Sequence, residues 1–141
     1  MIAQYLWIAG SVIISLMGTS HLRATLGTTK LHPGDEQLIK DMQSSSLRIS
    51  DELNTWKSWI GFNATHSAGT MFIGIINFYL ALQQPDLLKS SWFLLLLTVV
   101  TTAFYVWVAV RYWMKAVKIL LMIVFACYAV AAILILCNNA C

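Results

Sequence analysis

Four long apolar stretches account for most of this 141-residue sequence, at about residues 2–26, 59–82, 92–112 and 116–136. Each is long enough to cross the hydrocarbon core of a bilayer, which is about 30 Å thick and takes about 20 helical residues. Hydrophobic residues make up 59% of the chain and charged residues only 11%. A soluble domain of this size could not bury so much apolar surface. We therefore predict an integral membrane protein surrounded by a lipid bilayer.

The apolar stretches also predict the fold class. Lipid offers the backbone no hydrogen-bonding partner, so each stretch should be α-helical. Strands of a membrane β-barrel are the alternative, but they alternate polar and apolar residues, and runs such as 92–97 do not. Short second and third connections join antiparallel neighbours. The prediction is an all-α polytopic fold: a single membrane domain over residues 1–141, built as an antiparallel four-transmembrane-helix bundle.

The basic residues indicate how the chain is oriented. Eight of the nine Lys and Arg residues lie in or beside the first and third connections, and the ninth, Lys89, lies in the second. The positive-inside rule then makes the first and third connections cytoplasmic and both termini periplasmic, in a bacterial inner membrane. No basic segment precedes the first stretch, so we expect a retained helix rather than a cleaved signal. The basic residues form no run interleaved with aromatics, so nucleic acid is not expected as a partner.

The long first connection, about residues 27–58, is expected to be helical rather than bare. His32–Gly34 is a helix breaker, and Asp35 and Glu36 after it are favourable at a helix N-terminus. Ser50 would cap a second helix that continues into the next apolar stretch. A flexible polar loop is the alternative interpretation. His32 itself is expected to lie in solvent.

Polar and small residues form stripes within the apolar stretches. In the second stretch they are Asn63, His66, Ser67, Thr70, Gly74 and Asn77. In the first stretch they are Ser11, Ser15, Gly18 and Thr25, with His21 on the flank. The third and fourth stretches offer Thr98, Thr102, Tyr105, Tyr112, Cys127 and Tyr128. At about 100° per residue, steps of three and four residues keep such side chains on one helix face. Small residues permit close approach of two helices, and hydroxyls and amides hydrogen-bond across the contact.

Two histidines are expected at similar depth on the first and second helices. His21 lies about five residues before the end of its stretch and His66 about seven residues into the next, which puts both roughly 8–11 Å inside the cytoplasmic boundary. Because the two helices are antiparallel and consecutive, the two imidazoles could face each other. Cofactor-binding candidates are His21, His66, Asn63, Ser67 and Thr70, and the candidate metal ligands are the two histidines.

Three interpretations of the histidine pair remain open. The imidazoles could be hydrogen-bonded packing groups between helices. They could ligate a metal or a haem b, as helical bundles do from facing helices, although the spans hold no carboxylate to orient either ring. They could form a proton or small-ligand site, because histidine titrates near neutrality and intramembrane ionisable groups are commonly functional.

The residue types in the apolar stretches favour a protein that is not an enzyme. The stretches contain no Asp or Glu, so paired carboxylate chemistry is not expected. Ser67 follows His66 directly, and consecutive helical residues project about 100° apart, which suits a nucleophile and its base poorly. The first expectation is a structural or accessory subunit, or a homo-oligomer, assembled through polar helix faces. The alternative is a binder of haem or of a hydrophobic small molecule at His21 and His66; a membrane enzyme or transporter ranks third.

The three cysteines point to no redox motif. Cys127 lies within the fourth stretch and is expected to be a small packing residue. Cys137 and Cys141 lie four residues apart beyond it. A disulfide between them and two free thiols are both compatible with that spacing.

Two segments resemble a known group of proteins. They are Gly18-Thr-Ser-His-Leu22 and Trp59-Ile-Gly-Phe-Asn-Ala-Thr-His-Ser-Ala-Gly69, with a Phe-Asn-x-x-His-Ser core. The pairing resembles small uncharacterised bacterial membrane proteins with four predicted helices. The resemblance covers the first half of the chain, and the second half is similar only in hydropathy. It implies the four-helix architecture and draws attention to Asn63, His66 and Ser67, and it implies no reaction.

Overall fold

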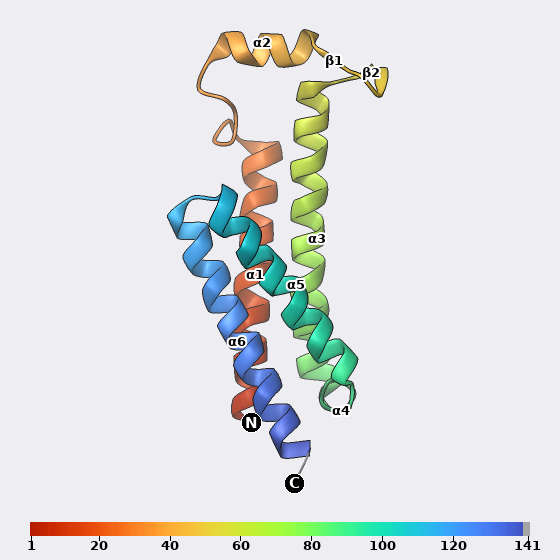
Figure 1. Cartoon of the computed structure of the whole chain (residues 1–141), viewed down its shortest axis with the longest axis vertical. Coiled ribbons are helices and arrows are strands. Elements are labelled where there is room, and N and C mark those ends of the chain that lie inside the picture. Colours follow the sequence, from red (N-terminus) through yellow and green to blue (C-terminus); the bar gives the residue numbers. More distant parts are fainter. Residues whose placement is uncertain (140–141) are drawn as a thin grey trace. The chain divides into compact units, whose positions relative to one another are not determined.

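The computed structural model of the chain describes residues 1–139 and is almost entirely helical (Figure 1). Four long helices follow the apolar stretches: α1 (Ile2–Gly27), α3 (Thr55–Gln83), α5 (Trp92–Tyr112) and α6 (Lys115–Asn139). Three of them, α1, α5 and α6, are long and apolar enough to cross a membrane. The expected all-α class is therefore confirmed, and the three apolar helices fit a protein that resides in a lipid bilayer.

The first connection contains the helix that the sequence predicts after its breaker. This helix, α2 (Glu36–Ser44), begins after Asp35, whose carboxylate accepts a 2.8 Å hydrogen bond from the backbone N–H of Gln37. The carboxylate satisfies one of the donors that a helix N-terminus leaves open. The negative charge of Glu36 in the first turn adds to the same effect.

The second helix expected in this connection, capped by Ser50, does not form. Instead β1 (Ser46–Leu47) and β2 (Ser50–Asn54) pair as an antiparallel hairpin, and α3 begins directly after it. The cap of α3 is Asn54, whose Oδ1 accepts a 2.8 Å hydrogen bond from the backbone N–H of Lys57. Because the cap lies at Asn54 rather than Ser50, the intervening residues stay extended.

The second connection also differs from the expected tight turn. Pro85 occupies the first turn of a short helix, α4 (Pro85–Ser90), where a proline costs no hydrogen bond. Ser91 then separates α4 from α5, and its side chain accepts from the backbone N–H of Leu94 at 3.3 Å. The second connection therefore contributes a helix that packs against α5 and α6.

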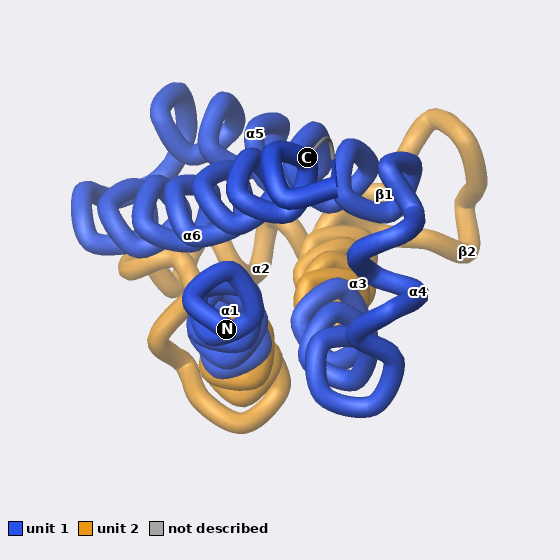
Figure 2. Tube along the Cα trace, turned by 90° about the horizontal axis from the view of Figure 1, so that it is seen from below, with its two compact units in different colours: residues 1–16, 71–141 blue, residues 17–70 orange. Residues whose placement is uncertain are grey.

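The chain divides into two compact units (Figure 2). Unit 1 comprises residues 1–16 and the chain from residue 71 onward, and unit 2 comprises residues 17–70. Unit 1 thus contains α4, α5 and α6, unit 2 contains α2 and the hairpin, and α1 and α3 contribute to both.

The core of unit 1 combines apolar side chains with aromatic contacts. α5 packs along α6 (Figure 1), and the buried side chains include Leu95 and Val124. The rings of Trp7 and Tyr128 are fully buried and meet edge to face, with centroids 4.8 Å apart. Edge-to-face packing matches the positive edge of one ring to the negative face of the other.

Within unit 1, a glycine permits a close approach of α3 to α1. A Cβ atom added at Gly74 would lie 2.8 Å from the backbone nitrogen of Ser15 and 2.9 Å from Cγ2 of Ile14. By contrast, a Cβ added at Gly69, on the same helix, would meet nothing within 4 Å. Gly74 is therefore required by packing, as its place in the polar stripe predicts.

Substitution of these two glycines should separate packing from helix propensity. Gly74→Ala should lower the free energy of unfolding by about 1–3 kcal/mol because the backbone of α1 must shift. Gly69→Ala should be neutral or slightly stabilising, since alanine favours a helix. Thermal unfolding of both purified variants in detergent measures the difference, and equal melting temperatures would contradict the close contact.

Candidate functional site

Asn77 is the centre of a buried hydrogen-bond network in unit 1. Its Oδ1 accepts from Nε1 of Trp7 on α1 at 3.0 Å and from Oγ1 of Thr98 on α5 at 3.1 Å. Its Nδ2 donates to the backbone carbonyl of Ile73 at 2.9 Å, which fixes the orientation of the amide. One side chain of α3 is therefore bonded to two other helices.

A second buried bond ties α6 to α1. Ser11 Oγ donates to the backbone carbonyl of Trp7 at 2.7 Å and lies 3.0 Å from the hydroxyl of Tyr128. Because the single hydroxyl proton of Ser11 goes to the carbonyl, Tyr128 donates and Ser11 accepts. The network thus reaches all four long helices, and these polar groups satisfy one another.

Trp7 was not among the residues singled out in the sequence. It is fully buried and supplies both a ring contact and the indole donor to Asn77. The available signal was spacing: Trp7 precedes Ser11 by four residues and so shares the face of the first polar stripe.

The histidines of α1 and α3 come together in unit 2. The rings of His21 on α1 and His66 on α3 are perpendicular, with centroids 5.8 Å apart. His21 Nε2 lies 3.2 Å from Oδ1 of Asn63, and both histidines are half-buried. The structure therefore brings together three of the five candidate cofactor-binding residues, including both candidate metal ligands.

The hydrogen bonds around Asn63 assign the tautomer of His21. Asn63 Nδ2 donates to the backbone carbonyl of Trp59 at 2.8 Å, so its Oδ1 is turned toward His21. An amide oxygen can only accept, so in the neutral ring the proton of His21 lies on Nε2 and Nδ1 is the unprotonated nitrogen.

The other two candidates, Ser67 and Thr70, lie beside this cluster but bond to their own helix. Ser67 Oγ donates to the carbonyl of Asn63 at 2.7 Å, and Thr70 Oγ1 donates to the carbonyl of His66 at 2.9 Å. Both side chains are buried. The two hydroxyls therefore bond to the stretch of α3 backbone that carries Asn63 and His66.

A series of aromatic side chains in contact with one another links the first connection to the region of the two histidines. His32, expected in solvent, instead packs edge to face on Trp56 with centroids 4.9 Å apart and is half-buried. Trp56 in turn stacks on Trp59, with ring centroids 5.7 Å apart. The backbone carbonyl of Trp59 accepts a hydrogen bond from the side-chain amide of Asn63. The contact with Trp56 accounts for the partial burial of the His32 ring.

The ring geometry does not fit a haem held between the two imidazoles. A haem bound by both imidazoles needs one ring nitrogen on each side of the iron. Here the rings of His21 and His66 meet edge to face, and Nε2 of His21 is directed at Asn63. Among residues 1–139, no three His, Cys, Asp or Glu side chains are grouped to hold a metal ion.

Cys127 and Cys137 belong to unit 1, whereas both histidines belong to unit 2. Cys127 is half-buried on α6 in unit 1, where its Cβ would be 3.3 Å from a Cβ added at Gly10. Cys137 is an exposed free thiol. The alternative of a Cys137–Cys141 disulfide involves a residue outside the described part of the chain.

Comparison of the sequence with protein-family models and with curated proteins, and of the structure with solved structures, finds no match.

The Asn77 network predicts unequal effects for two isosteric substitutions on α5. Thr98→Val removes an interhelical donor and should cost about 0.6–1.7 kcal/mol of unfolding free energy. Thr102→Val serves as the control, because that hydroxyl is also buried but donates only to carbonyls of α5, at Thr98 and Val99. Unfolding in detergent by titration with dodecyl sulfate measures both, and equal costs would argue against the interhelical bond.

Proposed function

We propose that α3 crosses the membrane as a fourth span, so that the protein is an antiparallel four-transmembrane-helix bundle. α3 has 29 residues and would extend about 44 Å, more than the hydrocarbon thickness of about 30 Å. Polar residues lower its hydropathy, but Ser67, Thr70 and Asn77 donate to backbone carbonyls of α3 itself. Polar groups satisfied in this way are tolerated within a bilayer.

The proposed orientation follows from the charges. With eight of nine basic residues in or beside the first and third connections, these connections face the cytoplasm and both termini face outward. The resemblance of the first half of the chain to small bacterial membrane proteins supports placement in a bacterial inner membrane.

Fusions to reporter proteins test the fourth span. A fusion after Ser45 should show cytoplasmic green fluorescence and no alkaline phosphatase activity. A fusion after Lys89 should show the opposite, because α3 lies between the two sites. If both fusions reported the same side, α3 would not cross the membrane and the four-span architecture would be wrong.

For this membrane protein we propose a binding function centred on His21, Asn63 and His66. The ligand class is a hydrophobic small molecule whose head group forms hydrogen bonds, such as a hydroxyl or a carbonyl. The observation that carries the proposal is the perpendicular contact of the two imidazoles, 5.8 Å apart, beside an amide that is held in one orientation.

A comparison of the polar side chains in the two units supports a role for the imidazoles other than helix packing. In unit 1, interhelical bonds are made by neutral hydroxyl, indole and amide groups such as Ser11, Trp7 and Asn77. An imidazole is costlier in a membrane, offers a donor and an acceptor on one ring, and titrates near neutrality. The two rings meet edge to face, and Asn63 orients that of His21, so a polar head group would meet two imidazoles in a defined arrangement.

Analysis of what co-purifies with the protein tests this function. A molecule detected by mass spectrometry of the wild type in mild detergent should decrease about tenfold or more in His21→Ala and His66→Ala, the equivalent of one or two hydrogen bonds. Thr65→Ala is the control, because that exposed hydroxyl bonds only to carbonyls of its own helix. Equal ligand content in all four proteins would exclude the site. If the wild type showed a Soret absorption band that is lost in His66→Ala, the ligand would be haem and not the proposed small molecule.

One observation favours a second candidate, an accessory subunit or a homo-oligomer. The polar stripes bond within the chain, but the opposite face of α3 carries Gly61, Thr65 and Gly69 one turn apart, and all three are exposed. A Cβ at either glycine would meet nothing within 4 Å, and the Thr65 hydroxyl is satisfied by its own helix. Small residues at this spacing let a neighbouring transmembrane helix approach closely.

Bulky substitutions on that face test association. Gly61→Leu and Gly69→Leu should convert an oligomer to a monomer, as measured by light scattering in mild detergent, because leucine prevents close backbone contact. Ala126→Leu, at an exposed position on α6, should leave the assembly unchanged. A wild-type protein that is already monomeric, in detergent and when cross-linked in its membrane, would remove this candidate.

A further inference from the structure

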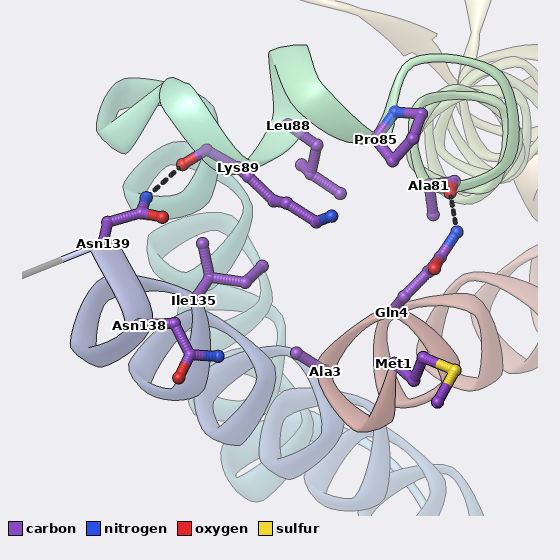
Figure 3. A pocket seen from close by; sticks show the side chains of 10 residues that line it. All are labelled: Met1, Ala3, Gln4, Ala81, Pro85, Leu88, Lys89, Ile135, Asn138 and Asn139. Carbon is purple, nitrogen blue, oxygen red and sulfur yellow. Dashed lines mark hydrogen bonds between the residues drawn. The ribbon is translucent and has the colours of Figure 1, made fainter. Parts of the chain in front are cut away.

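Unit 1 contains a pocket of about 200 Å³ where the first residues of α1 meet the end of α3, α4 and the end of α6 (Figure 3). Its apolar walls are the side chains of Ala81, Leu88 and Ile135, each almost completely buried. Its polar side chains are those of Gln4, Lys89, Asn138 and Asn139. The pocket therefore combines an apolar floor with a small number of hydrogen-bonding groups and the positive charge of Lys89.

Lys89 is the charged group of this pocket. Its side chain extends over Leu88 and Ile135 into the pocket (Figure 3). Its own backbone carbonyl accepts a 2.7 Å hydrogen bond from Nδ2 of Asn139, which fixes α4 against the end of α6. Within residues 1–139 the ammonium group forms no ion pair. A cation held in this way favours an anionic ligand.

Two amides add directional groups. Gln4 Nε2 donates to the backbone carbonyl of Ala81 at 2.7 Å, which orients the side chain at the pocket wall (Figure 3). An amide nitrogen carries two protons, so the second N–H of Gln4 can donate to a ligand. Asn138 is exposed at the mouth of the pocket and can donate as well.

The position of the pocket narrows the ligand class. It lies at the ends of α1 and α6, two of the helices apolar enough to cross a membrane. Ends of such helices lie at the level of the lipid head groups, where lysine is a common partner of phosphate. The volume is below the roughly 300–1,000 Å³ of pockets that enclose whole small molecules. A head group fits inside, whereas acyl chains would stay outside against the apolar helix faces.

We propose that this pocket binds the phosphate head group of an anionic phospholipid, with Lys89 as counter-charge and the amides of Gln4 and Asn138 as donors. The inference is independent of the imidazole pair, because none of its residues belongs to unit 2. It requires only that α1 and α6 lie in the membrane.

Native mass spectrometry with added lipid tests the proposal. Wild-type protein in detergent should bind phosphatidylglycerol about tenfold more tightly than phosphatidylcholine, and Lys89→Gln should abolish that preference. Lys115→Gln, which removes an exposed lysine from the start of α6, should retain it. Asn138→Trp, which fills the mouth from an exposed position, should weaken binding without affecting folding.

Two results would overturn the proposal. One is a preference for phosphatidylglycerol that survives in Lys89→Gln. The other is displacement of the lipid by millimolar inorganic phosphate, which would assign the pocket to a free anion. The two sites are tested separately. If His66→Ala loses the co-purifying molecule but keeps the preference for phosphatidylglycerol, the lipid pocket is supported as a site distinct from the imidazole pair.

Discussion

The side-chain oxygen of Asn77 is the interaction on which the arrangement of unit 1 depends. It accepts from Trp7 and Thr98 and so joins α1, α3 and α5 at one buried point, while Tyr128 attaches α6 through Ser11. In hydrocarbon an unpaired amide or indole would cost several kcal/mol, so alternative registers of the helices are disfavoured. Gly74 complements the network by letting α3 approach α1 closely enough for these bonds to form.

The two polar clusters have different chemical characters. The cluster in unit 1 uses groups that stay neutral, and its donors and acceptors match one another. The cluster in unit 2 places two imidazoles edge to face, beside an amide fixed by the carbonyl of Trp59. The first joins helices through neutral groups, and the second contains two imidazoles in contact with each other. This difference is the reason for proposing binding at His21 and His66.

Much of this organisation could be predicted from spacing in the sequence. A helix advances by about 100° per residue, so the shared face of Asn63, His66 and Asn77 follows from their positions. The proximity of His21 and His66 follows from counting residues back from one connection. The bonding partner of each polar group could not be predicted in the same way, because periodicity within one helix carries no information about its neighbour. The roles of Trp7 and Thr98 in binding Asn77 emerge only when the helices are packed.

The first connection shows where local signals are ambiguous. Ser50, Asp51 and Glu52 suit a helix N-terminus, but Asn54 is an equally good cap and is the one used. With the hairpin in place, Trp56 and Trp59 lie at the start of α3. There the ring of Trp56 packs on His32, and the carbonyl of Trp59 accepts a hydrogen bond from Asn63.

A double-mutant cycle on Trp7 and Asn77 tests most directly whether interhelical bonds within one chain hold the bundle together. The single variants Trp7→Phe and Asn77→Leu and their combination would be unfolded in detergent, and the coupling free energy calculated. The account predicts a coupling between about 0.6 and 1.7 kcal/mol, the range of interhelical hydrogen bonds in membranes. If the loss of unfolding free energy in the double variant equals the sum of the losses in the two single variants, the account is contradicted.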